Sequence, residues 1–194
     1  MGENSKSTAL HLTGEGKRFL LGAARKTLEA VAAGDPAPDF STPLESLKTR
    51  CGAFVTLRNK GELRGCIGYI RGIAPLLKTV VEMAEAAALR DPRFEPVRQQ
   101  EVPDVDIEIS VLSPLEKCTD LDAIEVGRHG LLIEKGFHSG LLLPQVAVEY
   151  EWDRRTFLEQ TCLKAGLPTE AYKDKETEIS VFYAEVFGEK ELDP

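Results

Sequence analysis

The feature that most constrains the fold of this chain is one order of elements that occurs twice: two strands joined by a tight turn, a helix and a third strand. The first set spans residues 51–113, with expected elements at 51–57, 63–70, 76–91 and 105–112. The second set spans residues 129–187, with expected elements at 130–134, 141–143, 153–165 and 178–187. Period-two alternation indicates the strands, and apolar stripes at helical spacing indicate the helices. Hairpins that lead into helices predict an α+β fold with a mainly antiparallel sheet and flanking helices.

Short sequence matches accompany the repeated order. Each hairpin carries Lys, Gly, three variable residues and Gly, at 60–65 and again at 135–140. Further along, Glu108–Val111 recurs as Glu178–Val181. Because topology and two matches follow the same order, we predict an internal ββαβ duplication.

A helix precedes the first hairpin. Thr13 is a suitable N-cap, apolar residues follow at helical spacing, and Gly34 is a suitable C-terminal stop, so the helix is expected over 13–34. The proline-rich segment 35–43 that follows is an expected loop, and Phe40 is expected to attach it to the core.

The most informative candidate site is one six-residue run: Leu63, Arg64, Gly65, Cys66, Ile67 and Gly68. Strand alternation places Arg64, Cys66 and Gly68 on one face and the other three residues on the opposite face. A guanidinium near a sulfur favours the thiolate, and glycines allow a ligand to approach closely. The second hairpin has Ser139 and Leu141 at the matching positions, so hairpin architecture alone does not require Arg and Cys.

Each residue of this pair also has a purely structural interpretation. Cys66 is a small apolar residue of a type that is often buried and inert. Arg64 can point to solvent or pair with a surface carboxylate. An Arg on the same face as the Cys argues against a deeply apolar face, because an unpaired buried charge is costly.

Two residues outside the run are further candidates. His129 precedes an expected strand and could serve as a base or hydrogen-bond partner for a thiol, or be a satisfied turn residue. Gln145 follows Pro144 at the end of an apolar strand and could face a cleft, or bond to local backbone. Trp152 is expected to be a core anchor and Cys162 a buried helix residue, whereas Glu108 is expected at the surface or, second, in a cleft.

Composition narrows the classes of partner and compartment. The formal net charge of −8 and the pI of about 5.1 disfavour nucleic acid and anionic membranes as principal partners. There is no apolar run of the roughly 20 residues that span a bilayer. Because Met1–His11 is polar and lacks the apolar core of a signal peptide, a cytoplasmic location is expected.

The cysteine and histidine pattern supports neither disulfides nor a metal site. The four cysteines are far apart, and there is no CxxC or HExxH motif. His11, His129 and His138 are dispersed, so no metal is expected. A glycine-rich phosphate loop, a nucleophile-elbow serine and a dinucleotide fingerprint are all missing from the sequence, so the cofactor stays unknown.

Several blocks resemble the AMMECR-one domain family over nearly the whole chain: Leu63–Gly68, Asp91–Phe94, Ile109–Pro114, His129–Leu131 and Leu142–Val146. The resemblance implies a single such domain over 1–194, an α+β fold with two unequal subdomains, and a cleft near the six-residue signature. It also offers Memo-like and radical-SAM proteins as partners. It supplies no reaction, and only the signature residues carry over as the suspected site.

Three hypotheses follow. In the first, the protein is an enzyme in which Cys66, acidified by Arg64 and served by His129, attacks or binds a small anionic or carbonyl substrate. In the second, it is a non-catalytic ligand-binding or adaptor module in which Arg64 captures an acidic group and Cys66 only packs. In the third, the signature only specifies the sheet.

Overall fold

The computed structural model describes residues 12–192, so the polar segment Met1–His11, with His11, lies outside the described residues. The chain divides into two compact units. Within the described range, the larger unit contains residues 12–112 and 185–192, and the smaller contains 113–184. The chain therefore enters the smaller unit after Leu112 and returns to the larger unit after Ala184.

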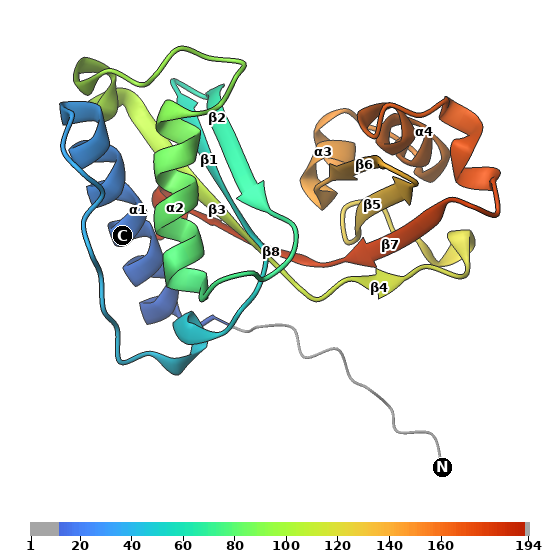
Figure 1. Ribbon diagram of the computed structural model, residues 1–194, viewed down its shortest axis with the longest axis horizontal. Helices are drawn as coiled ribbons and strands as arrows, with labels where there is room; N and C mark the ends of the chain where they lie inside the picture. Colours follow the sequence, from blue (N-terminus) through green and yellow to red (C-terminus); the bar gives the residue numbers. More distant parts are fainter. Residues whose placement is uncertain (1–11, 193–194) are drawn as a thin grey trace. The chain divides into compact units, whose positions relative to one another are not determined.

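The larger unit is a four-stranded antiparallel sheet with helices on one face (Figure 1). The strand order is β2-β1-β3-β8, and β1 is antiparallel to β2 and to β3. The strands are β1 (Ala53–Asn59), β2 (Glu62–Tyr69), β3 (Val105–Leu112) and β8 (Ala184–Gly188). The helices are α1 (Gly14–Ala33), η1 (Glu45–Lys48), α2 (Leu76–Leu89), η2 (Gln99–Asp104) and α5 (Glu189–Leu192).

Local signals explain the boundaries of α1 and of the first hairpin. The Thr13 side chain accepts the backbone N–H of Gly16, and Gly34 adopts the left-handed conformation with φ +89°. Lys60 and Gly61 have φ of +51° and +90°, the positive values that a two-residue type I′ turn needs. The strand expected at 105–112 is β3, with identical bounds.

The core of the larger unit lies between the sheet and its two long helices. Alternate residues of β1 and β3 face these helices and are buried: Ala53, Val55, Leu57, Val105, Ile107, Ile109 and Val111. They pack with the apolar stripes of α1 and α2, which include Leu20, Ala24, Leu28, Val80 and Ala84. The partly buried Phe40 packs against the same cluster.

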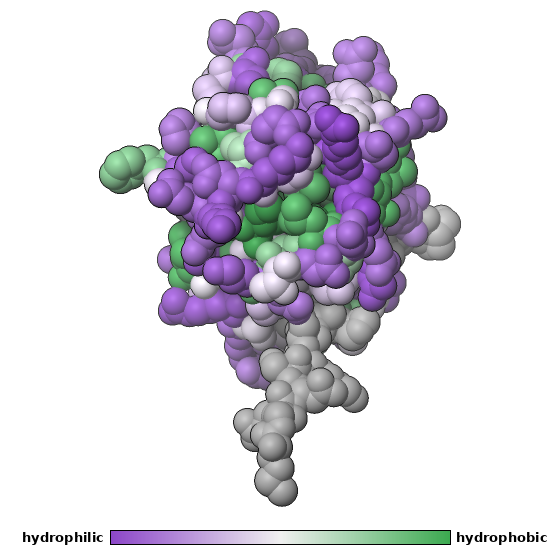
Figure 2. All heavy atoms as spheres, turned by 90° about the vertical axis from the view of Figure 1, so that its right-hand side faces the viewer, coloured by the Kyte–Doolittle hydropathy of each residue, from purple (hydrophilic) through white to green (hydrophobic). Residues whose placement is uncertain are grey.

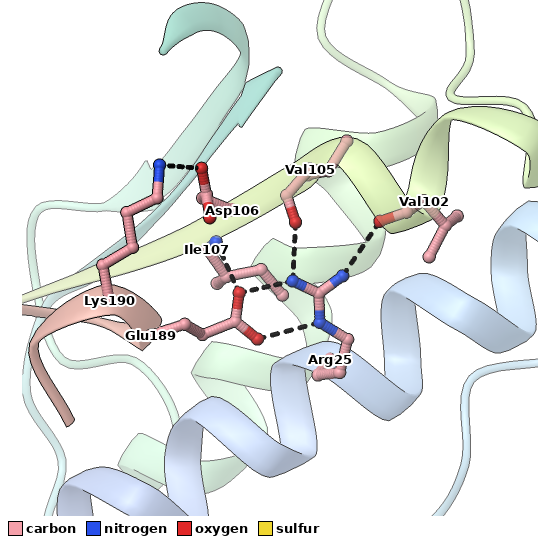
Figure 3. Close-up of polar contacts among 7 residues, drawn as sticks. All are labelled: Arg25, Val102, Val105, Asp106, Ile107, Glu189 and Lys190. Carbon is pink, nitrogen blue, oxygen red and sulfur yellow. Dashed lines mark hydrogen bonds and ion pairs between the residues drawn. The ribbon is translucent and has the colours of Figure 1, made fainter. Parts of the chain in front are cut away.

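An ion pair connects α1 to the C-terminal helix of the larger unit (Figure 3). The Nε atom of Arg25 donates to Glu189 at 2.8 Å, and its Nη2 atom also contacts this carboxylate. The guanidinium donates to the carbonyl oxygens of Val102 and Val105 as well, at 3.2 and 2.6 Å. Glu189 in turn accepts the backbone N–H of Ile107 at 2.9 Å. This network fixes the start of α5 against the start of β3.

The smaller unit contains a second four-stranded antiparallel sheet, in the order β4-β7-β5-β6 (Figure 1). Its strands are β4 (Glu116–Lys117), β5 (Gly130–Lys135), β6 (His138–Leu142) and β7 (Glu178–Phe182). Its helices are η3 (Leu121–Ala123), α3 (Pro144–Glu149), α4 (Arg154–Lys164) and η4 (Thr169–Lys173). Leu131, Ile133 and Phe157 lie in its buried core. Trp152 packs against this core and stacks on Tyr150, with ring centroids 5.0 Å apart.

The single strand expected at 178–187 is wrong. It is two strands, β7 and β8, which belong to different sheets and are separated at Tyr183. The backbone N–H of Tyr183 donates to the hydroxyl of Ser113 at 2.9 Å, and the Ser113 N–H donates to the Tyr183 carbonyl oxygen at 2.9 Å. At Tyr183 these two hydrogen bonds to Ser113 take the place of the hydrogen bonds to a neighbouring strand of either sheet. The strand expected at 141–143 is β6, which begins earlier and ends before the first turn of α3.

On the face of the molecule drawn in Figure 2, apolar residues are exposed among polar ones. Large apolar side chains of the smaller unit are exposed: Phe137, Val148, Tyr150 and Leu163. Within residues 12–192, no helix combines the length and the hydropathy that crossing a bilayer requires.

Candidate functional site

The six-residue signature lies on β2, an edge strand of the larger unit's sheet. Cys66 is opposite Thr56 of β1, and Gly68 is opposite Phe54. A Cβ atom on Gly65 would lie 2.2 Å from the carbonyl oxygen of Ala87, so the glycine allows α2 to pack directly on the strand. A Cβ atom on Gly68 would lie 2.3 Å from the ring of Phe54. The space at both glycines is therefore filled by the chain itself and not left open for a ligand.

A β-bulge changes the expected alternation at Arg64. Leu57 pairs with Gly65 and Arg58 pairs with Leu63, so Arg64 is the extra residue of β2. The regular alternation from which Arg64 and Cys66 were expected to share a face is therefore interrupted between them and the turn. Leu63 is opposite Arg58 and is exposed, whereas Ile67 packs against the core.

The guanidinium of Arg64 is already used in the fold. Its Nε atom donates to Glu101 at 2.9 Å, and its Nη2 atom donates to the same carboxylate at 3.2 Å and to the Pro96 carbonyl oxygen at 3.3 Å. It also lies over the ring of Phe94, 6.0 Å from the centroid. Its side chain is only 15% exposed. Arg64 thus connects β2 to η2 and to the loop before η2, and the carboxylate of Glu101 largely neutralises its charge.

The backbone of Cys66 is held by a second acid and base pair. The Cys66 N–H donates to Asp91 at 2.9 Å, and the Cys66 carbonyl oxygen accepts from Nη2 of Arg93 at 3.3 Å. Arg93 also donates to both carboxylate oxygens of Asp91, at 2.9 and 2.7 Å. Asp91 and Arg93 thus form hydrogen bonds with the backbone N–H and C=O groups of Cys66, which an edge strand would otherwise offer to a neighbouring strand.

Arg93 differs from Arg64 in its exposure. The Asp91 side chain is 2% exposed, but the Arg93 side chain is 48% exposed. Its guanidinium lies over the ring of Phe94 at 5.4 Å. The buried carboxylate and the ring therefore fix a half-exposed cation beside Cys66.

The thiol of Cys66 is not acidified. Burial raises its pKa above the ordinary value, and the charges of Asp91 and Glu108 act in the same direction. The Thr56 hydroxyl, 3.3 Å from Sγ, and the charge of Arg93 act in the opposite direction but do not compensate. The expectation that Arg64 acidifies this thiol is wrong, because Arg64 is paired with Glu101 and Arg93 is the cation that acts on Cys66.

Sequence reasoning missed one polar row on this sheet. Thr56 is opposite Cys66 on one side and opposite Glu108 on the other, so the three residues form a row across β2, β1 and β3. Thr56 is 5% exposed, although its neighbours on β1 alternate as expected. A buried Thr opposite a Cys was detectable only once the hairpin register was known.

His129 belongs to the smaller unit, and its own contacts fix its state. The backbone N–H of Glu125 donates to Nδ1 at 3.0 Å, so the neutral ring carries its proton on Nε2, 3.2 Å from the Tyr183 hydroxyl. Burial lowers the pKa of His129. Because both ring nitrogens are engaged within the smaller unit, nothing here supports the expected role of a base for the Cys66 thiol.

The remaining candidates belong to the smaller unit. Gln145 is in the first turn of α3 of the smaller unit and is partly buried. Cys162 is buried in α4, as the sequence predicted. Among the described residues, no group of three or more His, Cys, Asp or Glu side chains is arranged to hold a metal ion.

Comparison with known proteins agrees with this architecture. The profile of the AMMECR1 family matches residues 21–187, and the chain belongs to that family. A protein of Methanothermobacter thermautotrophicus is 44% identical over 179 residues, which cover 89% of this chain and 93% of that protein. A protein of Methanopyrus kandleri is 43% identical over 189 residues, covering 93% and 91% of the two chains.

A crystal structure of an uncharacterised Pyrococcus horikoshii protein has the same α+β fold. It superposes with a TM-score of 0.85 at 40% identity and covers 89% of this chain and 90% of its own. These relatives carry no stated activity, so function has to be argued from the site.

Proposed function

We propose that this chain is a non-catalytic binding module, and that Arg93 is the group of the larger unit that captures an acidic group of a ligand or partner protein. The observation that carries the proposal is the half-exposed side chain of Arg93, whose guanidinium is held in place by the buried carboxylate of Asp91. A positioned guanidinium matches the geometry of carboxylates and phosphates.

Arg93, and not Arg64, is the residue that captures the acidic group. Arg64 donates two hydrogen bonds to Glu101 and is mostly buried, so an external anion would have to displace the carboxylate of Glu101. Arg93 uses its Nε and Nη2 atoms inside the fold and keeps about half of its side chain exposed. Memo-like and radical-SAM proteins, which the family resemblance offers, are the partners we propose to test.

The repeated hairpins indicate which signature residues serve an architecture that the two halves share. The first half has strand order β2-β1-β3 and the second has β6-β5-β7, which is the same order within each half. Gly65 lies against the backbone of Ala87 in α2, and Gly140 lies against that of Ala165 at the end of α4. We infer that the halves derive from an internal duplication in which the glycines keep the shared architecture. The second hairpin has Leu141 where the first has Cys66.

Calorimetric titration of the full chain with purified Memo-like and radical-SAM proteins tests the binding role. Arg93→Gln should weaken binding at least about tenfold, the loss expected for one charge-assisted contact. Arg18→Gln, an exposed cation of α1, is the matched control and should bind normally. Normal binding by Arg93→Gln would refute the proposal, provided its melting temperature shows that it is folded.

Arg93→Lys separates charge from geometry in the same assay. Lysine keeps the positive charge but lacks the planar fork with which arginine donates in parallel to the two oxygens of Asp91. We expect binding between that of the wild type and that of Arg93→Gln. Binding lost equally in the two variants, with equal loss of thermal stability, would mean that Arg93 acts only through the fold.

A second candidate is an enzyme that uses the Cys66 thiol, and the row of Cys66, Thr56 and Glu108 favours it. The Thr56 hydroxyl within 3.3 Å of Sγ and the nearby Arg93 both favour the thiolate. The raised pKa of Cys66 makes this candidate the weaker one, because the reactive form is the thiolate.

A further inference from the structure

A cavity of about 620 Å³ lies in the larger unit, away from the signature and from Arg93. One wall is the segment that follows α1, residues 37–42, and the other is a stripe of α2: Leu77, Lys78, Val81, Glu82 and Glu85. Sites for small molecules typically measure roughly 300–1,000 Å³. The cavity is therefore large enough for a small organic ligand.

The segment wall is shaped by the sequence before any ligand binds. Pro38 lines the cavity, and Pro36 and Pro43 lie on either side of the wall, where each ring fixes its own φ. The Thr42 hydroxyl accepts the N–H of Leu44 at 3.2 Å, and Phe40 packs against the core. Because this wall is already ordered, the segment loses less conformational entropy when a ligand binds.

The lining combines an apolar surface with carboxylates that are more shielded than the ammonium groups. Phe40 and Val81 contribute apolar surface from opposite walls. The lysine side chains are 67% exposed at Lys78 and 51% at Lys48, but the acids are only 37% exposed at Glu82 and 30% at Glu85. Solvent therefore screens the charges of Glu82 and Glu85 less than those of Lys48 and Lys78.

Of the two α2 carboxylates in the lining, Glu82 has the greater capacity for a ligand. Its nearest cation, Lys78, is 3.7 Å away, longer than the roughly 2.7–2.9 Å of a strong charge-assisted hydrogen bond. Glu85, by contrast, is bonded to Arg90 at 2.7 Å. Asp39 adds a third carboxylate from the segment wall.

We propose that this cavity binds a small amine with an apolar body, whose ammonium group lies at Glu82 and whose body lies between Phe40 and Val81. This site is independent of Arg93, since no residue that lines the cavity belongs to β2 or to the segment 90–98 between α2 and η2. The protein would then have two separate recognition sites in its larger unit, one for an acidic group and one for an amine.

A matched pair of probes, 4-phenylbutylamine and 4-phenylbutyrate, tests the proposal on the full chain. Titration followed by amide chemical shifts should place the amine at α2 residues 77–85, with affinity at least about fivefold higher than that of the carboxylate. Equal or tighter binding of 4-phenylbutyrate would overturn the charge assignment. Saturable shifts elsewhere, or none in this stripe, would overturn the site.

Two variants and a control complete the test. Glu82→Gln should weaken the amine about fivefold, whereas Glu29→Gln, which removes an exposed carboxylate of α1 outside the cavity, should not. Val81→Trp should abolish binding by filling the cavity. If Val81→Trp does not fold, Glu82→Gln still decides, and unchanged affinity in that variant refutes the proposal.

Discussion

The buried carboxylate of Asp91 accepts the backbone N–H of Cys66 at 2.9 Å and connects the signature strand to a loop 25 residues further along the chain. The same carboxylate positions Arg93. One side chain thus closes the edge of the sheet and sets the geometry of the proposed binding cation. The signature strand therefore contributes to the stability of the sheet as well as to the candidate site.

Folding stability should fall in acid because of Asp91. The hydrogen bond from Arg93 holds the pKa of Asp91 at about 2, below its ordinary value of 3.8. Because the folded pKa is the lower one, this contribution is complete above about pH 5 and is lost as pH falls toward about 2. Its size is about 2 kcal/mol, and denaturant melts from pH 2 to pH 7 measure it. Asp91→Asn should be less stable at pH 7 and should vary less with pH, and an unaltered profile would contradict the role of Asp91.

Gly65→Ala should strongly destabilise the larger unit. The added Cβ would lie 2.2 Å from a backbone oxygen of α2, which cannot move aside as a flexible side chain could. We expect a loss of at least about 2–3 kcal/mol in the free energy of unfolding. Gly22→Ala is the control, because Gly22 is in α1 with no atom within 4 Å of the added Cβ, and it should stabilise by about 0.5–1 kcal/mol. Equal effects in the two variants would mean that the helix does not approach β2 as described.

Glu151→Gly should stabilise the smaller unit. Glu151 has φ +52°, and the N–H groups of Glu151 and Trp152 donate to Val148 and Ala147, a pattern that usually places glycine at this position. Relieving the left-handed backbone should add about 1 kcal/mol, less any gain in unfolded-state entropy. Thermal denaturation measures the change. A loss of stability would show that the Glu151 side chain makes a contact that outweighs the backbone strain.

His129 should be neutral at pH 7 and should stay neutral to a lower pH than an ordinary histidine does. Burial lowers its pKa from 6.5, so its contribution to stability is present above about pH 6.5 and is lost as pH falls through the lower folded value. Imidazole nitrogen shifts should report the Nε2–H tautomer at pH 7, since Nδ1 accepts from Glu125. Tyr183→Phe removes the partner of Nε2 without changing the tautomer. An Nδ1–H tautomer in the wild type would contradict the hydrogen-bond assignment.

Local signals made much of the larger unit predictable. Thr13 and Gly34 limit α1, and Lys60 with Gly61 forms the turn, because each of these effects involves residues close in sequence. The bulge at Arg64 was not predictable, because it depends on how β2 pairs with Leu57 and Arg58. The pattern of alternation within one strand contains no information about an extra residue.

Most of the features that sequence reasoning missed depend on distant partners. The break at Tyr183 depends on Ser113, which is 70 residues away. The family resemblance included Asp91 and Arg93, but their role follows only from their contact with the Cys66 backbone. Helix α3 was the exception, since Pro144 at its start is a common first-turn residue.

The rate of alkylation of each cysteine against pH, followed by mass spectrometry of the folded protein, tests the non-catalytic account most directly. Burial raises the pKa of Cys66, and that of Cys51 to about 11, so both should react slowly at pH 7, and their rates should keep rising with pH to beyond about pH 9. Cys118 and Cys162 serve as internal references, and Cys162 should react only after denaturation. If Cys66 reacts fastest of the four cysteines, and its rate does not fall as the pH is lowered to 7 or below, the account is contradicted and an activated thiolate is established.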